Sequence, residues 1–171
     1  NLKLGIIMDP IESINIKKDS SFAMLLAAQR QNWQIFYLKQ GDLFQQDENV
    51  FAHSQSLQVE DNDEKWLTAG PTEEINLADL DVTLMRKDPP FDMEYIYTTY
   101  RLEHVEKSGT LIINKPASLR DANEKLFATQ FPQCCTKTLV TSHPEKLRDF
   151  ITKQKDVILK PLDGMGGQSI F

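Results

Sequence analysis

The opening of the chain alternates between two kinds of hydrophobic pattern, and this alternation constrains the fold more than any other feature. Residues 2–8 are a short apolar run ended by a proline, which is typical of an interior strand. In residues 20–32 the apolar residues instead recur at helical spacing, with Asp19 or Ser20 as the capping residue. Residues 33–38 return to a strand pattern. Strand, helix and strand in this order predict a parallel, Rossmann-like α/β unit without the dinucleotide-binding glycines.

Further strand patterns continue through the first 120 residues. Residues 41–80 carry only short strand-like pieces between polar stretches, which predicts hairpins at an edge of the sheet. Buried-strand patterns return at residues 82–85 and 110–114, and a helix pattern that Asp92 can cap lies between them. We therefore expect residues 1–120 to form one α/β domain with a parallel sheet.

The character of the sequence changes beyond residue 120. Residues 138–142 and 157–159 predict two strands, and a helix pattern that opens on a proline covers residues 144–154. We expect residues 121–171 to be the start of a second domain. About 50 residues with so few strands would make a small core, so we expect this domain either to be truncated or to continue in further chain.

A lysine and a glycine-rich loop close the chain. Lys160 follows the predicted strand at residues 157–159, and the next residue is a proline that prevents further ladder pairing, so the lysine is expected at the end of a stiff element. Gly164, Gly166 and Gly167 can bring backbone N–H groups close to an anion. The spacing fits neither a Walker loop nor the dinucleotide fingerprint. We interpret the stretch as a site for nucleotide phosphates, and the alternative is an ordinary hairpin turn.

Lys125 and Lys160 are two cations that would lie over the α- and β-phosphates of ATP in this interpretation. Their charge would offset the phosphate charge that otherwise repels an incoming carboxylate. The alternative is that each is a surface lysine. Lys160 is distinguished by its place between an apolar run and a glycine loop, whereas no local pattern distinguishes Lys125.

Two polar loops are candidates for binding a carboxylate. Asn15 and Lys18 lie just before the first predicted helix, whose N-terminus adds positive potential and free N–H groups. Arg86 follows the predicted strand at residues 82–85, where open α/β sheets place their ligands, and its guanidinium suits a carboxylate. The alternatives are a solvated loop in the first case and a structural ion pair between Arg86 and Asp88 in the second.

The composition argues against several classes of partner. The formal net charge of −6 and the lack of a basic run argue against binding to nucleic acid or to a membrane surface. No stretch approaches the roughly 20 apolar residues of a membrane span, and we expect no signal peptide. Cys134 and Cys135 are adjacent and cannot join distant segments, which fits a reducing cytoplasm. We therefore expect a cytoplasmic protein with small-molecule partners and no metal ligands among these residues. We also expect a homo-oligomer, but the composition is not the basis of that expectation.

Seven blocks of the sequence match a known family. They are residues 3–10, 14–24, 84–92, 114–116, 118–121, 123–127 and 158–167, the last reading Ile158-Leu-Lys-Pro-Leu-Asp-Gly-Met-Gly-Gly167. Together they closely resemble the bacterial glutathione synthetases of the ATP-grasp superfamily, and several are long enough to be highly specific. The resemblance implies a pre-ATP-grasp domain over residues 1–120 and the truncated first part of an ATP-grasp domain over residues 121–171.

The resemblance implies an ATP-dependent carboxylate–amine ligase that joins γ-glutamylcysteine to glycine and releases ADP and phosphate. In this family ATP first phosphorylates the cysteinyl carboxylate, and the glycine amine then attacks the acyl phosphate. At the matching positions, the resemblance implies that ATP is bound by Lys125, Lys160, Gly164, Met165, Gly166 and Gly167, with the two lysines as catalytic residues. It places Asn15, Lys18 and Arg86 on the γ-glutamylcysteine side.

The resemblance also implies Mg²⁺, whose ligands in the family lie in a later part of the ATP-grasp domain. Because ATP chemistry without Mg²⁺ lacks its main charge neutraliser, a polypeptide ending at Phe171 is expected to be inactive. Two alternatives stay open. Another ATP-grasp carboxylate–amine ligase would share Lys160 and the glycine loop but not residues 15–24 or 86–92. A non-catalytic nucleotide-binding module would lack the metal ligands altogether.

Overall fold

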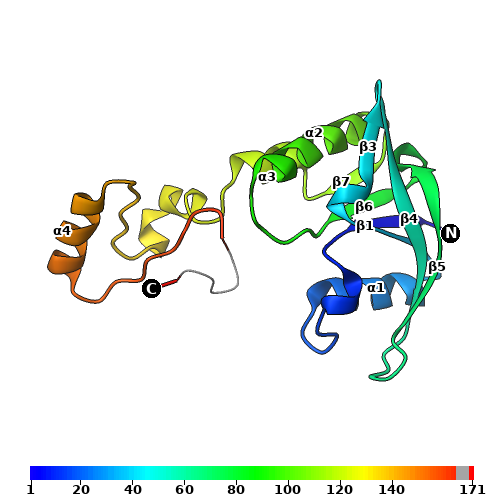
Figure 1. Cartoon of the computed structure of the whole chain (residues 1–171), viewed down its shortest axis with the longest axis horizontal. Coiled ribbons are helices and arrows are strands. Elements are labelled where there is room, and N and C mark those ends of the chain that lie inside the picture. The colour runs from blue at the N-terminus through cyan, green and yellow to red at the C-terminus, as the bar shows by residue number, and fades with distance from the viewer. Residues whose placement is uncertain (165–169) are drawn as a thin grey trace.

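A single mixed sheet with helices on both faces forms the larger part of the molecule (Figure 1). The structure is a computed structural model that describes residues 1–164 and 170–171. Within these residues the strands are β1 (Lys3–Ile7), β2 (Gln34–Leu38), β3 (Leu43–Gln46), β4 (Asn49–Val59), β5 (Leu67–Asn76), β6 (Val82–Met85) and β7 (Leu111–Ile113). The α-helices are α1 (Ser20–Arg30), α2 (Met93–Lys107), α3 (Pro116–Asp121) and α4 (Pro144–Gln154).

The centre of the sheet is parallel, as the sequence predicts. The strand order is β3-β4-β2-β1-β6-β7, with β5 paired to β4. β1 pairs in parallel with β2 on one side and with β6 on the other, and β6 pairs in parallel with β7. The connection from β1 to β2 therefore runs toward one edge of the sheet, and the connection from β6 to β7 runs toward the opposite edge. Right-handed crossovers in opposite directions put α1 and α2 on opposite faces, as Figure 1 shows.

The two helices bury two separate apolar clusters against the sheet. Phe22 and Leu25 of α1 pack with Ile6 of β1 on one face, whereas Leu102 of α2 packs with Ile7 of β1 on the other. Successive residues of a strand point to opposite faces, so a strand covered on both sides must be apolar at every position. This explains why the first strand was readable as a continuous apolar run.

Both long helices of the sheet begin at the residues expected from their capping chemistry. The Asp19 carboxylate accepts a hydrogen bond from the Phe22 N–H at 2.8 Å, and the Asp92 carboxylate accepts one from the Tyr95 N–H at 2.9 Å. Each carboxylate satisfies an N–H group that has no partner within the helix. Among the described residues, no helix combines the length and the hydrophobicity needed to cross a membrane.

Residues 41–80 form antiparallel hairpins at the edge of the sheet, as predicted. β4 pairs antiparallel with β2, β3 and β5. The expectation of several short pieces is wrong in detail, because β4 is one continuous strand of 11 residues with an irregularity between Gln55 and Leu57. Several of its outward-facing side chains, such as His53, are polar, and they divided the apolar pattern into fragments.

The helix predicted at residues 144–154 is confirmed as α4, but the two strands predicted after residue 120 are wrong. Neither residues 138–142 nor residues 157–159 form a strand, and Ile158 is 68% exposed. Leu159 instead exchanges two backbone hydrogen bonds with Phe171, at 2.8 and 3.2 Å. An apolar run becomes a strand only where neighbouring strands complete its ladder and cover its faces. None of the described residues beyond residue 120 is buried, so these runs have no such surroundings.

Candidate functional site

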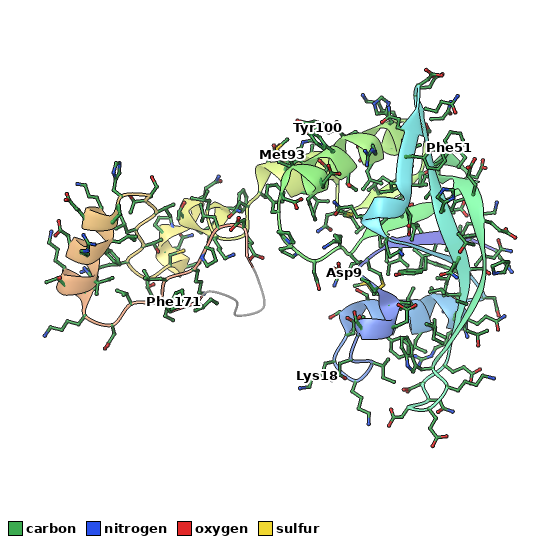
Figure 2. All side chains as sticks on the ribbon, viewed as in Figure 1. Asp9, Lys18, Phe51, Met93, Tyr100 and Phe171 are labelled. Carbon is green, nitrogen blue, oxygen red and sulfur yellow. The ribbon has the colours of Figure 1, made fainter. Side chains whose placement is uncertain are left out.

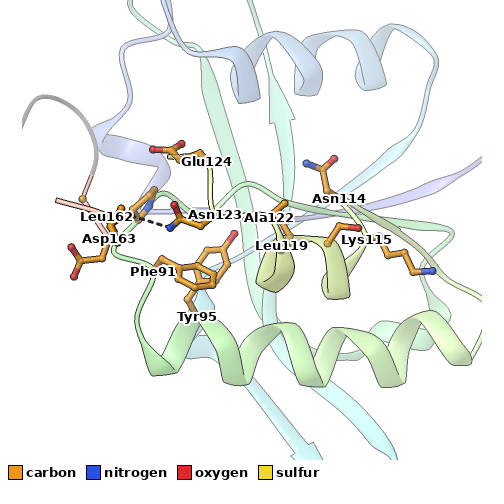
Figure 3. Close-up of a pocket in the computed structure, with 13 residues that line it drawn as sticks. Phe91, Tyr95, Asn114, Lys115, Leu119, Ala122, Asn123, Glu124, Leu162 and Asp163 are labelled. Atoms are coloured by element: carbon orange, nitrogen blue, oxygen red, sulfur yellow. Dashed lines mark hydrogen bonds between the residues drawn. The ribbon is translucent and has the colours of Figure 1, made fainter. Parts of the chain in front are cut away.

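A pocket of about 630 Å³ lies where the parallel strands β6 and β7 end (Figure 3). Its lining includes Phe91 after β6, Tyr95 of α2, Asn114 after β7 and Leu119 of α3. Its other side is formed by segments beyond residue 120, with Asn123, Glu124, Leu162, Asp163 and Gly164. Ligands of open α/β sheets bind outside the carboxyl ends of the strands, and this pocket has that position.

Lys125 and Gly164 are brought together beside this pocket. The Lys125 ammonium donates a hydrogen bond to the Gly164 carbonyl oxygen at 2.5 Å, and the Glu124 carboxylate lies 3.3 Å from the same nitrogen. The side chain of Lys125 is 21% exposed, whereas that of Glu124 is 69% exposed. Lys125 is therefore a partly buried cation that contacts the start of the glycine loop, in contrast to the alternative of an ordinary surface lysine.

Asn123 makes a contact that sequence reasoning missed. Its side-chain oxygen accepts hydrogen bonds from the N–H groups of Lys125 and Leu126, both at 3.0 Å. Its side-chain nitrogen donates to the Leu162 carbonyl oxygen at 3.1 Å, across 39 positions of sequence, as the dashed line in Figure 3 shows. The asparagine two residues before the lysine was a visible signal for the local turn. Nothing local indicated the distant partner.

Lys160 is placed differently from its prediction. Because residues 157–159 form no strand, Lys160 does not lie at the end of a sheet strand, and it is exposed. The glycine loop is only partly described: Gly164 lies within the described residues, and Met165, Gly166 and Gly167 lie outside them. Of the residues expected to bind ATP, Lys125 and Gly164 are thus the two that the structure brings into contact.

Arg86 lies at the N-terminus of α1. Its Nε donates a hydrogen bond to the hydroxyl oxygen of Ser21 at 3.1 Å, and its backbone N–H donates to the Ile7 carbonyl oxygen at 2.7 Å. The alternative ion pair between Arg86 and Asp88 is not formed. The backbone N–H of Asp88 instead donates to the Asp9 carboxylate at 3.0 Å, and that carboxylate pairs with Lys87 at 2.9 Å.

Arg86 also acts on the electrostatics of the pocket. Burial raises the pKa of the Tyr95 hydroxyl above its usual value, and the positive charge of Arg86 lowers that pKa in part. Tyr95 lines the pocket, so the guanidinium is close enough to influence the pocket wall while it is hydrogen-bonded to Ser21.

Asn15 and Lys18 lie on the exposed loop that leads into α1. The Asn15 side-chain oxygen accepts a hydrogen bond from the Lys17 N–H at 3.1 Å, and the Lys18 N–H donates to the Asn15 carbonyl oxygen at 2.9 Å. Figure 2 shows Lys18 at the outer end of this loop. Lys17 pairs with Asp63 at 2.7 Å, and this contact raises the pKa of the Lys17 ammonium. Asn15 thus shapes the loop, and Lys17 ties it to the connection between β4 and β5.

Among the described residues, no group of three or more His, Cys, Asp or Glu side chains could hold a metal ion. Cys134 is exposed, and the Cys135 thiol donates to the Ala128 carbonyl oxygen.

Two family models match successive parts of the chain. The model described as the N-terminal domain of prokaryotic glutathione synthetase matches residues 2–120, and the model described as the ATP-grasp domain of prokaryotic glutathione synthetase matches residues 124–171. The first match alone covers more than half of the chain.

Relatives over the whole chain have the same description. Proteins called glutathione synthetase from Pseudomonas putida and Pseudomonas syringae pv. tomato are 56% and 58% identical over 171 residues, which is 100% of this chain and 54% of each relative. The protein of that name from Escherichia coli K12 is 56% identical over 170 residues, covering 99% of this chain and 54% of the relative. The chain thus spans about half the length of these curated relatives, and it belongs to the prokaryotic glutathione synthetase family.

Proposed function

We propose that the protein containing these residues ligates γ-glutamylcysteine to glycine at the expense of ATP, giving glutathione, ADP and phosphate. The observation that carries the proposal is identity of 56 to 58% to glutathione synthetases over essentially the whole chain. The pocket at the carboxyl ends of β6 and β7 supports it, because the cavity is large enough for small substrates and Gly164 in its wall accepts a hydrogen bond from the partly buried ammonium of Lys125.

We further propose two domains, residues 1–120 and 121–171. The limits of the two family matches support this division. The distribution of burial supports it as well, because every buried residue that the structure describes lies before residue 121. The pocket then lies between the two domains, where ligand sites often occur.

On the ATP side, Lys125, Lys160 and residues 164–167 would bind the nucleotide. The Lys125 ammonium has three donors, and one of them is directed to the Gly164 carbonyl. The Glu124 carboxylate lies 3.3 Å from the same nitrogen, and the donor that is left suits a phosphate oxygen, whose negative charge would otherwise repel the substrate carboxylate. Transfer of the γ-phosphoryl group to the cysteinyl carboxylate gives an acyl phosphate and ADP. Attack by the glycine amine then forms the amide bond and breaks the bond to phosphate, which leaves as the anion.

On the dipeptide side, Asn15, Lys18 and Arg86 would bind γ-glutamylcysteine. The hydrogen bond from Arg86 Nε to Ser21 fixes the guanidinium at the N-terminus of α1, where its remaining N–H donors suit a carboxylate. The free N–H groups of the first turn add further positive potential at this place.

The same proposal extends to the partners, the localisation, the assembly and the metal of the protein. The partners would be ATP, γ-glutamylcysteine and glycine, with no nucleic acid or membrane, in a cytoplasmic homo-oligomer. The net charge of −6 supports small-molecule partners. Magnesium would support the phosphoryl transfer, with ligands outside the described residues.

Release of ADP by the intact protein tests the proposal. We expect release to require both γ-glutamylcysteine and glycine, and to stop when either is omitted. ADP release that is indifferent to glycine would contradict it. Release supported by a pair of simple amino acids, in place of the dipeptide, would favour another carboxylate–amine ligase.

A further inference from the structure

We propose that Asn123 is a positioning residue for ATP, which holds the Lys125 ammonium and the start of the glycine loop in one fixed arrangement. The inference rests on the proposed function, because it assumes that Lys125 faces a nucleotide. Asn123 itself need not touch ATP. Its amide joins two segments that both border the pocket and are far apart in the sequence.

The oxygen of the Asn123 side chain shapes the segment that carries the lysine. It accepts two backbone N–H groups, those of Lys125 and Leu126, at 3.0 Å each. The Phe127 N–H also donates to the Asn123 backbone carbonyl, at 2.7 Å. These bonds close a turn over residues 123–127 and fix the direction in which the Lys125 side chain leaves the backbone.

The nitrogen of the same side chain reaches the other segment. It donates to the Leu162 carbonyl oxygen at 3.1 Å, two residues before the carbonyl of Gly164 that accepts the Lys125 ammonium at 2.5 Å. Asn123 and Lys125 therefore bind two carbonyls of the same stretch of backbone, two residues apart. The two contacts define both the distance and the orientation between the lysine and the loop.

This arrangement matters because the described residues beyond residue 120 contain no buried core. Where packing does not fix two segments relative to each other, specific hydrogen bonds must do so. The Phe91 N–H donates to the Asp163 carbonyl oxygen at 3.4 Å, which is a longer contact. The bond from the Asn123 side chain to the Leu162 carbonyl is shorter than the Phe91 bond, at 3.1 Å.

Two substitutions separate the role of the Asn123 side-chain oxygen from that of its side-chain nitrogen. Asn123→Ser keeps a side-chain oxygen that can accept from the turn, and it removes the donor to Leu162 without adding charge. Asn123→Asp also keeps the acceptors and removes the donor, and it adds a negative charge near the proposed phosphate site. We expect the KM for ATP to rise roughly three- to tenfold in Asn123→Ser and further in Asn123→Asp, with the KM for γ-glutamylcysteine within about twofold of wild type.

Asn62 provides a matched control elsewhere in the chain. Its side-chain oxygen accepts the N–H groups of Glu64 and Lys65, at 2.9 and 3.3 Å, so it makes the same kind of turn in an exposed position between β4 and β5. We expect Asn62→Ser to leave the KM for ATP unchanged. If Asn123→Ser and Asn62→Ser have the same KM for ATP as wild type, or if Asn123→Ser lowers only thermal stability, Asn123 is a structural residue and the inference is overturned.

Direct titration of the intact protein with ATP, followed calorimetrically, keeps this test independent of ligase activity. Weaker ATP binding in Asn123→Ser, but not in Asn62→Ser, supports the inference even if the wild-type protein fails to join γ-glutamylcysteine to glycine, which would defeat the proposed function alone. Equal ATP affinity in all three proteins, or no ATP binding by the wild type, overturns it.

Discussion

The guanidinium of Arg120 lies over the aromatic ring of Tyr100, with 4.4 Å between the guanidinium carbon and the ring centroid. The same guanidinium donates to the Thr99 hydroxyl oxygen at 3.0 Å and pairs with the Glu103 carboxylate. Arg120 is on α3, and its three partners are on α2. One side chain thus fastens α3 to the sheet-bound helix α2.

Replacing Arg120 should therefore destabilise the protein. Arg120→Ala removes the ring contact, the hydrogen bond and the ion pair together, and it leaves the half-buried Glu103 carboxylate without its partner. We expect the free energy of unfolding to fall by about 1 to 3 kcal/mol. Urea unfolding followed by circular dichroism measures the change. Arg148→Ala, at an exposed position of α4, is the control and should have little effect.

A second prediction concerns a buried hydroxyl in the centre of the sheet. Thr83 of β6 is fully buried, and its hydroxyl is the one buried side-chain polar atom without a hydrogen-bond partner in the described part of the chain. Thr83→Val replaces the hydroxyl by a methyl group of similar size. It therefore removes the free-energy cost of burying a hydroxyl without a hydrogen-bond partner. We expect the free energy of unfolding to stay the same or to rise by up to about 1 kcal/mol.

Thr110 offers the matched comparison for Thr83. It is also buried, at the start of β7, but its hydroxyl bonds the carbonyl oxygens of Leu77 and Leu80 at 3.1 and 3.0 Å. We expect Thr110→Val to lower the free energy of unfolding by about 1 to 2 kcal/mol, because it leaves buried carbonyls less well satisfied. Equal losses in both variants would show that the Thr83 hydroxyl has a partner in solution.

A third prediction follows from the raised pKa of Tyr95. Burial raises the pKa of its hydroxyl above the usual 10.0 in the folded protein, although Arg86 opposes the shift. Above pH 10 the unfolded chain therefore loses this proton before the folded chain does. The contribution of Tyr95 to stability is complete below this pH, and it is lost as the pH rises through the folded pKa.

The fall in stability as the pH rises above about 10 measures this effect. We expect Tyr95→Phe to show a smaller fall than wild type. Tyr97→Phe is the control, because Tyr97 lies on the same helix and is 45% exposed, and its fall should match wild type. A Tyr95→Phe protein with the wild-type pH dependence would contradict the assignment.

The parts of the fold that the sequence predicted are those encoded by neighbouring residues. Asp19 and Asp92 indicate where their helices begin, because each carboxylate accepts a hydrogen bond from an N–H group three positions later. β1 was readable because it is buried on both faces. β4 was not read as one strand, because only one of its faces is buried and residues such as His53 interrupt the apolar run.

The errors concern features that depend on distant residues. The run at residues 157–159 has the composition of a buried strand, yet a strand needs ladder partners, and within the described part of the chain Leu159 has backbone bonds to Phe171 alone. Lys160 accordingly does not lie at the end of a strand, where the prediction placed it. Asn123 is the converse case: its composition signals a turn, but its role depends on a carbonyl 39 positions away. Local pattern carries no information on either relationship.

The last prediction separates the two proposed substrate sides by kinetics in the intact protein. Arg86→Lys keeps the positive charge but loses the planar fork and the bond from Nε to Ser21, so we expect the KM for γ-glutamylcysteine to rise about tenfold while the KM for ATP stays within about twofold. Lys160→Ala should do the reverse and raise the KM for ATP more than about tenfold. Initial rates with one substrate varied at saturating levels of the others measure both constants. If both variants raised both constants to the same extent, Arg86 and Lys160 would act on one shared site, and the assignment of Arg86 to the dipeptide would be wrong.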